Sequence, residues 1–549
     1  EERVQRWVAR IREALAGDGF QLHYQPVLNL QGEPLELYEA YLRLEHNGEL
    51  LSPTAFLGIA EEHGLLADIN RWVVSQAIAV LAQRDRDGHA TQMLVKVTPE
   101  SFDDPQMIAT LHRLLAAPET HRQLVELAAG APASAVLSLR LPLPGAPADW
   151  LALLPGEQPW WYRARPQRGE YRLAIGHALQ LVSAGPNRFA ALDNAFNGVC
   201  RDWRRNGPAL AFAGFAFDTR NDQPLPNALL AIPGLLLESR DGQCALTLST
   251  TAGRLAQSLA EWPGWLHAKH PAETGEMLPC RAEPLADRAW MARVIAALRD
   301  MGRGQFDKVV LSRSRRIAST QAFSARRILA RLNAQQPASV VYGHGHGQLA
   351  FLGASPERLV GKQGRRIRVD ALAGTAWPGS LALAEGKNRH EQSLVVRAIC
   401  EALAPCCAAA PEVGDLEEHA AGQLRHWRSR IRAQALGETT LFDLLRALHP
   451  TPAVGGFPAA AAQTWLDAHH EKRNGWYSGG FGMLTPEGDG EFSVALRSAL
   501  LDGCTAELQA GAGIVAGSDP EQELAETEAK FGTLLAALGA TPARHSRCA

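Results

Sequence analysis

Residues 511–530 read GAGIVAGSDPEQELAETEAK and join a glycine-rich segment to the start of an acidic helix. Asp519 followed by Pro520 is a favourable pair for the N-cap and first position of a helix. Glu523 and Glu526 lie three residues apart and share one helical face. Two adjacent carboxylates repel each other unless a cation or water screens them, and hard oxygen ligands suit Mg²⁺. The alternative is a solvated acidic first turn, which the helix dipole favours.

The same stretch also fits the GxGxxA form of a dinucleotide-binding turn at residues 511–516. That motif needs a second parallel strand after the helix, ending in an acidic residue that holds the ribose. After Leu538 the sequence has only a short segment containing proline and arginine. We therefore expect no dinucleotide site here.

The composition limits the classes of protein to which this chain can belong. The 549 residues are 46% hydrophobic, so the chain can bury large cores and contain several domains. A formal net charge of −3 predicts no broad basic field, and we expect no nucleic-acid partner. The eight cysteines show no metal-ligand spacing, which favours a reducing cytoplasm and argues against zinc. No apolar run approaches the length of a membrane span, so we expect a cytoplasmic protein without a membrane partner.

Residues 1–116 are expected to form a unit of their own. The pattern predicts an amphipathic helix near residues 4–15, and then two extended segments joined by a turn at Gly32 and Pro34. Two helical patterns at residues 53–62 and 68–84 precede an apolar strand at residues 93–97.

Two motifs in this unit, YQPV at residues 24–27 and EAYLRL at residues 39–44, resemble those of the EAL domain, a cyclic di-GMP phosphodiesterase or receptor barrel. The resemblance makes Glu39 a metal ligand. However, Tyr41 replaces the signature leucine, and Lys96 stands where an asparagine ligand is expected. A parallel eight-stranded barrel needs roughly 200 residues or more to close. We therefore expect an incomplete, degenerate (β/α) barrel fragment that has no catalysis of its own and does not bind cyclic di-GMP.

A second pattern runs from residue 117 to about residue 540 and leaves residues 541–549 as a tail. Alternating segments predict strands at residues 160–179, 210–217 and 243–251. In the strand predicted at residues 306–313, Lys308 shares a face with Val310. A lysine that loses its hydration at an apolar strand can act as a base, although an exposed edge lysine is the simpler interpretation.

Further candidates follow along the chain. Glu357 ends the turn GASPE, and Glu391 lies near the start of a predicted helix. His426 lies in LRHWRSRIR, whose arginines we interpret as one face of a solvated helix. The segment GHGHG, with His344 and His346, is expected to be a flexible hairpin tip.

Eight motifs then follow one another in the order found in chorismate-utilising enzymes: FDKVVLSR, FLGASPERLV, ALAGT, NRHEQSLVV, LHPTPAVGG, GWYSGGFG, EFSVALRSAL and the opening stretch. The set is most similar to isochorismate synthases of siderophore, salicylate or menaquinone pathways. The resemblance implies an α+β chorismate-binding fold over residues 117–540, with two stacked antiparallel sheets surrounded by helices. It also implies chorismate as the substrate.

The same resemblance implies roles for single residues. Lys308 would activate water for attack at C2 of chorismate, and Glu357 would protonate the departing C4 hydroxyl, beside His426 near the reacting ring. The remaining residues would bind ligands: Glu391 and Glu526 would hold Mg²⁺ with support from Glu523, Tyr477 and Arg497 would orient the pyruvyl carboxylate, and Gly374, Thr375 and Gly513 would lie against the substrate and add amide donors.

Three alternatives remain open at this point. A salicylate synthase, which adds elimination of pyruvate in the same pocket, shares nearly all these motifs. A cyclic di-GMP-binding signalling protein would use the amino-terminal unit instead. A chorismate-fold pseudoenzyme is the third, because the segment between Thr375 and Glu391 is shorter than the family pattern.

Overall fold

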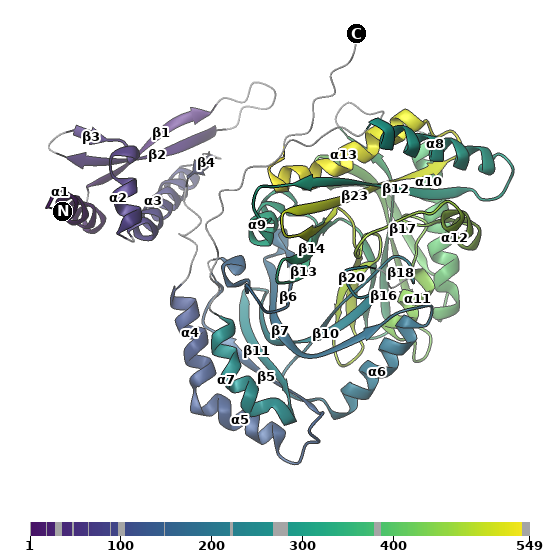
Figure 1. The fold of residues 1–549 in the computed structure, drawn as a ribbon, viewed down its shortest axis with the longest axis horizontal. Helices are drawn as coiled ribbons and strands as arrows, with labels where there is room; N and C mark the ends of the chain where they lie inside the picture. The colour runs from purple at the N-terminus through teal and green to yellow at the C-terminus, as the bar shows by residue number, and fades with distance from the viewer. Residues whose placement is uncertain are drawn as a thin grey trace, which may run out of the picture. The chain divides into compact units, whose positions relative to one another are not determined.

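The computed structural model describes residues 2–17, 19–27, 36–46, 49–63, 65–87, 89, 91–96, 105–147, 149–219, 223–266, 284–377 and 386–540. The chain divides into two compact units (Figure 1). The first contains Glu1–Met107 and Pro147–Ala152, and the second contains Ile108–Ala146 and Leu153–Ala549. Within the described ranges, no helix combines the length and the apolar character that crossing a membrane requires.

The first unit is a small sheet with helices. Strand β2 pairs antiparallel with β1 and β3 and parallel with β4, as the predicted hairpin and the following strand require. The turn at Gly32 and Pro34 lies outside the described residues. The elements are α1 (Glu2–Ala16), β1 (Phe20–Val27), β2 (Glu36–His46), β3 (Glu49–Leu51), η1 (Pro53–Ala55), α2 (Leu57–Glu62), α3 (Leu66–Arg86) and β4 (Thr91–Val95).

The carboxylate of Glu39 is held by protein donors in this unit. Lys96 Nζ lies 2.6 Å from Glu39 Oε1, and the hydroxyl of Tyr41 donates to Glu39 Oε2 at 2.7 Å. Hydrogen bonds from Lys96 and Tyr41 lower the pKa of Glu39. The two residues that depart from the EAL pattern therefore satisfy the carboxylate that the pattern assigns to a metal.

The second unit carries most of the chain. Its strands are β5 (Val136–Leu143), β6 (Trp160–Arg165), β7 (Glu170–Ser183), β8 (Arg204–Asn206), β9 (Ala211–Phe215), β10 (Ala228–Arg240), β11 (Gln243–Thr251), β12 (Lys308–Ala318), β13 (Val340–His346), β14 (Leu349–Ser355), β15 (Arg358–Gln363), β16 (Arg366–Ala376), β17 (Glu412–Ala421), β18 (Leu424–Gln434), β19 (Gly456–Phe457), β20 (Gly480–Leu484), β21 (Gly490–Val494), β22 (Ser498–Asp502) and β23 (Thr505–Val515). Its helices are α4 (Pro105–Ala116), α5 (Pro118–Ala128), α6 (Arg188–Asp202), α7 (Leu255–Trp265), α8 (Pro284–Met301), α9 (Ala325–Gln335), α10 (Gly386–Leu403), α11 (Leu441–Leu448), α12 (Ala459–Ala468) and α13 (Pro520–Leu538).

Strand β10 belongs to two sheets. Residues 228–231 pair with β9, residues 235–240 pair with β11, and most of the strand pairs with β7. The register of the β7 pairing shifts between Ile232 and Pro233, because proline has no amide hydrogen to donate. One sheet continues from β10 through β7, β6, β13, β14, β22, β23 and β12, and the other through β9, β20, β21, β15, β16 and β18. These pairings are antiparallel, as predicted.

The two sheets face each other across an aromatic core. Trp161 of β6 and Phe212 of β9 have ring centroids 5.7 Å apart, and Trp476 lies 5.6 Å from Trp161. A Cβ atom on Gly214 would come within 2.2 Å of the Trp476 ring, so only glycine fits there. On the far side of the second sheet, the stripe predicted for α10, including Val395 and Ile399, is buried in a larger helix-covered core.

Two local expectations were wrong. Residues 343–346 of GHGHG belong to β13, and His344 is buried with Nδ1 2.9 Å from the carbonyl oxygen of Trp160. The glycines leave room for the ring of Trp160, which approaches a Cβ position on Gly345 to 2.6 Å. The segment LRHWRSRIR is strand β18 instead of a helix, because it pairs along its length with β16 and β17.

Helix α13 begins as predicted. Asp519 Oδ1 accepts the amide hydrogens of Glu521 and Gln522 at 3.1 and 2.9 Å, and Pro520 occupies the first turn. The carboxylate satisfies two of the amides that a helix start leaves without partners. Glu523 and Glu526 therefore lie on a helix whose first turn is fixed by one side chain.

We expect Asp519→Ala to loosen this first turn. Loss of an N-cap costs about 1 kcal/mol, so amide hydrogen exchange at residues 521–526 should become roughly fivefold faster. Asp519→Asn keeps a capping oxygen and should exchange like the wild type. Equal exchange in the alanine variant and the wild type would show that the cap does not hold the turn.

Candidate active site

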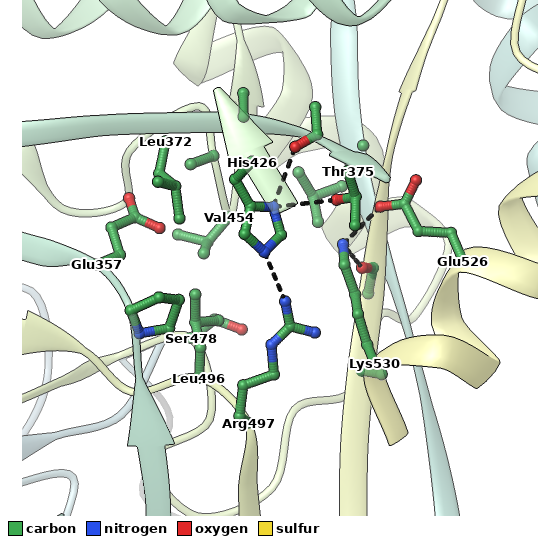
Figure 2. A pocket seen from close by; sticks show the side chains of 18 of the residues that line it. Glu357, Leu372, Thr375, His426, Val454, Ser478, Leu496, Arg497, Glu526 and Lys530 are labelled. Carbon is green, nitrogen blue, oxygen red and sulfur yellow. Dashed lines mark hydrogen bonds and ion pairs between the residues drawn. The ribbon is translucent and has the colours of Figure 1, made fainter. Parts of the chain in front are cut away.

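One cavity in the second unit collects most of the predicted site residues (Figure 2). Its walls come from both sheets, from α10 and from α13. Among the predicted residues, those that line it are Glu357, Gly374, Thr375, Glu391, His426, Tyr477, Arg497, Gly513 and Glu526. Lys308 and Glu523 are not lining residues, but both are buried, and Lys308 contacts the lining residue Glu391.

A buried ion pair joins β12 to α10. Lys308 is fully buried, and its Nζ lies 2.9 Å from Glu391 Oε1. The other oxygen of Glu391 accepts the amide hydrogen of Gly374 at 3.2 Å. A Cβ atom on Gly513 would lie 2.2 Å from Glu391 Oε1 and 3.0 Å from Lys308 Cε, so this pair requires glycine on β23. Burial opposes the charge on Glu391, but Lys308, together with Lys387 and Lys530, holds the pKa of Glu391 below its usual value.

Glu357 lies between β14 and β15, and its electrostatic environment is opposite to that of Glu391. Its side chain is 3% exposed, and within the described ranges its Oε1 has no hydrogen-bond partner. Burial, with a contribution from the charge of Asp370, raises the pKa of Glu357 to about 8, although nearby cations oppose the shift. At neutral pH this carboxyl group is therefore protonated and can donate a proton into the cavity.

His426 is a neutral imidazole with one defined tautomer. Its Nδ1 lies 3.0 Å from the carbonyl oxygen of Gly374, and Arg497 Nη2 donates to Nε2 at 3.1 Å (Figure 2). A carbonyl only accepts and a guanidinium only donates, so the ring hydrogen is on Nδ1. Burial and the charge of Arg497 keep the pKa of His426 well below its usual value. The histidine thus orients Arg497 without adding charge.

Two residues of the cavity have strained backbones. Ser478 and Arg497 adopt φ values of 59° and 50°, a region that costs residues with a side chain about 1–3 kcal/mol. Hydrogen bonds hold both in place: Ser478 N donates to the carbonyl of Ala495 at 2.9 Å, and Ala354 N donates to that of Arg497 at 3.2 Å. Such strain is concentrated at ligand-binding positions.

Arg497 and Tyr477 supply donors for an anion. Burial lowers the pKa of Arg497 to about 10, so the guanidinium remains charged at neutral pH. In the described part of the chain its buried Nη1 has no hydrogen-bond partner. Burial raises the pKa of Tyr477 to about 12, which keeps its hydroxyl hydrogen in place. A bound carboxylate would satisfy a buried donor that is otherwise costly.

Each carboxylate predicted to bind the metal is paired with a lysine. Lys308 pairs with Glu391, Lys530 lies 2.6 Å from Glu526, and Lys387 pairs with Glu523. Lys530 also lines the cavity and donates to the carbonyl of Gly511 at 2.8 Å. Lys387 and Lys530 were not among the residues predicted from the sequence. For Lys530 the signal was present, because it lies four residues from Glu526 on the same helix. Lys387 pairs with Glu523 of a different helix.

The carboxylates nevertheless fit Mg²⁺. No group of three or more histidine, cysteine or acidic side chains is arranged for a metal among the described residues. Mg²⁺ is commonly held by only one or two carboxylates together with water and substrate oxygens, and Glu391 and Glu526 line the same cavity. Glu523 is 1% exposed, and its Oε2 has no hydrogen-bond partner in the described ranges. Burial, with a smaller contribution from the charge of Glu526, raises the pKa of Glu523 to about 7.

Comparisons with known proteins agree with this geometry. The family model described as chorismate binding enzyme matches residues 123–539, and that of the EAL domain matches residues 8–134. The salicylate biosynthesis isochorismate synthase of Pseudomonas aeruginosa is 32% identical over 415 residues, which cover 70% of this chain and 86% of that protein. The isochorismate synthase MenF of Bacillus subtilis is 29% identical over 354 residues, covering 61% of this chain and 75% of that protein.

A solved structure is similar in fold. The menaquinone-specific isochorismate synthase MenF of Escherichia coli superposes with a TM-score of 0.65 at 24% identity, covering 79% of this chain and 99% of that one. The expected chorismate-binding fold is thereby confirmed for the second unit, and the EAL resemblance of the first unit agrees with the match at residues 8–134. The family match spans the whole catalytic cavity, and the chain belongs to the chorismate-binding enzymes.

Proposed function

We propose that this enzyme is an Mg²⁺-dependent isochorismate synthase. The reaction adds water at C2 of chorismate, shifts the ring double bonds and expels the C4 hydroxyl, so that the product is an isomer of the substrate. The observation that carries the proposal is Glu357, a buried carboxyl whose pKa of about 8 keeps it protonated in a cavity that also contains a buried lysine pair. The names of the similar proteins, which are isochorismate synthases, support the same reaction.

Glu357 serves as the general acid. The C4 hydroxyl leaves as water only if it gains a proton as the C–O bond breaks. Glu357 has a proton to give at neutral pH, and the anion left behind is stabilised by the nearby charges of Lys308, Lys530 and Arg497. The positive charges around Glu357 therefore stabilise the carboxylate that forms when Glu357 protonates the leaving group.

Lys308 serves as the general base. It must be a neutral amine to take the proton of the attacking water. In the structure its ammonium group is the counter-ion of Glu391. Glu391 and Glu526 would hold Mg²⁺, which would supply a counter-charge in place of the ammonium of Lys308 and an electrophile for the ring carboxylate of the substrate. Gly513 leaves the space in which Lys308 approaches Glu391. The role of Lys308 as a base therefore depends on how the charge of Glu391 is balanced.

Arg497 and Tyr477 orient the second carboxylate of the substrate. The guanidinium has a buried donor without a protein partner in the described ranges, and the tyrosine hydroxyl is protonated. His426 fixes Arg497 through its Nε2. These groups would hold the pyruvyl carboxylate while the ring reacts between Lys308 and Glu357.

The purified chain should convert chorismate to isochorismate in the presence of Mg²⁺ and release no pyruvate without added lyase. Chromatography of the products and a pyruvate assay test this. Salicylate together with pyruvate would replace the proposal by a salicylate synthase, and no turnover would leave a pseudoenzyme.

The same assay tests the residue roles. Lys308→Met and Glu357→Gln should each remove turnover, because one lacks a base and the other an acidic proton. Lys362→Met, at a lysine of β15 that does not line the cavity, is the matched control and should keep wild-type turnover. Circular dichroism verifies that the variants are folded. Near-normal turnover in either site variant would contradict its assigned role.

We expect kcat/KM to fall as the pH rises through about 8, because Glu357 then loses the proton it must donate. A pH profile of initial rates measures this limb. Asp370→Asn removes a negative charge that raises the pKa of Glu357, so the limb should move to lower pH. An unchanged limb in this variant would assign the titration to another group.

Glu526→Gln should weaken Mg²⁺ binding, measured by isothermal titration calorimetry without substrate and by the Mg²⁺ concentration needed for half-maximal rate. The loss of one anionic ligand predicts at least a tenfold increase in the dissociation constant, or about 1.4 kcal/mol. Glu521→Gln, an exposed glutamate on the first turn of the same helix, is the control and should bind Mg²⁺ normally. Equal binding by both variants would exclude Glu526 as a ligand.

A further inference from the structure

A second cavity lies beside the catalytic one and is strongly basic. In the register of β16 and β18, Arg366 is opposite Gln434, Arg368 is opposite Arg432 and Asp370 is opposite Arg430. Alternate residues of a strand share a face, so these side chains form one ladder. We call this cavity the arginine groove. Its charged lining comprises Arg168, Arg358, Arg366, Arg368, Arg428, Arg430 and Arg432, with Asp370 and Glu412 as the acidic members.

Part of this positive charge is compensated within the protein. Arg358 lies 3.2 Å from Glu491 and 3.5 Å from Asp370. Arg428 and Arg430 share Glu417, at 2.7 and 3.1 Å. These ion pairs reduce the net positive charge of Arg358, Arg428 and Arg430.

Three arginines at the outer end form no ion pair with a described residue. Arg366, Arg368 and Arg432 are exposed, and no described residue forms an ion pair or a side-chain hydrogen bond with any of them. In the register of β17 on β18, Glu412 lies opposite Arg432. Arg368 and Arg432 occupy directly opposed positions, an arrangement of like charges that destabilises a sheet. The chain as a whole has a formal net charge of −3, so this concentration of positive charge is local.

The arginine groove adjoins the catalytic cavity along three chain segments. On β16, Leu372 lines the catalytic cavity and Asp370, two residues before it on the same face, lines the arginine groove. On β18, His426 and Arg428 are related in the same way. Glu357 and Arg358 are adjacent in sequence and line one cavity each. Arg368 lies four residues along β16 from Leu372, roughly 13 Å at about 3.3 Å per residue.

We propose that the arginine groove is an anion-binding site that attracts the dicarboxylate substrate to the catalytic cavity. This inference rests on the proposed function, because chorismate carries two carboxylates. The guanidinium groups offer forked donors that match a carboxylate, and at the exposed end they remain hydrated enough to release it. The more deeply buried donors of Arg497 and Tyr477 then take the substrate in the catalytic cavity.

The triple variant Arg366→Gln, Arg368→Gln, Arg432→Gln tests the role in catalysis. At an ionic strength of about 0.01 M, where charges act over about 30 Å, KM for chorismate should rise about fivefold while kcat stays unchanged. The difference should disappear toward 1 M salt, where the screening length is about 3 Å. The control variant Arg201→Gln, Arg288→Gln, Arg316→Gln removes the same charge from exposed positions that line neither cavity. It should behave as the wild type.

A binding measurement makes the test independent of turnover. Pyranine, a fluorescent trisulfonate, should bind the wild type and the control variant equally, and the groove variant at least fivefold more weakly, by fluorescence anisotropy. Equal binding by all three proteins would overturn the anion site, and an unchanged KM at low salt would overturn its role in substrate capture. If the wild type does not convert chorismate, the proposed function fails, and pyranine binding still decides whether the groove binds anions.

Discussion

The buried ion pair between Lys308 and Glu391 is the constraint on which the catalytic cavity depends. Removing two charges from water costs several kcal/mol per ion, and their attraction offsets this only if the geometry is close. Three features provide that geometry: the pairing of β12 with β23, the missing side chain at Gly513, and the amide of Gly374 on the second carboxylate oxygen. The first two involve β12 and β23 of one sheet and the third involves β16 of the other, so the pair requires both sheets in their correct register.

The contrast between Glu391 and Glu357 shows how the fold gives two roles to one residue type. Both carboxyls are buried, which by itself favours the neutral form. Glu391 has the ammonium of Lys308 at 2.9 Å and remains charged. Glu357 has Asp370 nearby and no hydrogen-bond partner for Oε1 within the described ranges, so it stays protonated. One can therefore carry a cation while the other provides a proton.

The sequence predicted elements whose signals are local. Asp519 and Pro520 marked the start of α13, and the apolar spacing of Val395 and Ile399 marked the buried face of α10. Motif order brought together residues of one cavity that lie up to 169 positions apart, from Glu357 to Glu526.

What the sequence did not predict depends on pairing between distant segments. The segment around His426 was taken for a helix, although its alternating arginines have the period of a strand. Only the register of β18 on β16 places Arg368 opposite Arg432, and no local pattern contains that register. The role of Lys387 was also missed, because its counter-charge Glu523 lies on another helix and is near only when α10 and α13 are placed around one cavity. Because β10 is shared by both sheets, the walls of that cavity cannot swing apart on a hinge as the lobes of a two-domain enzyme do. Access to this cavity therefore depends on side chains and connecting segments and not on rotation of one sheet away from the other.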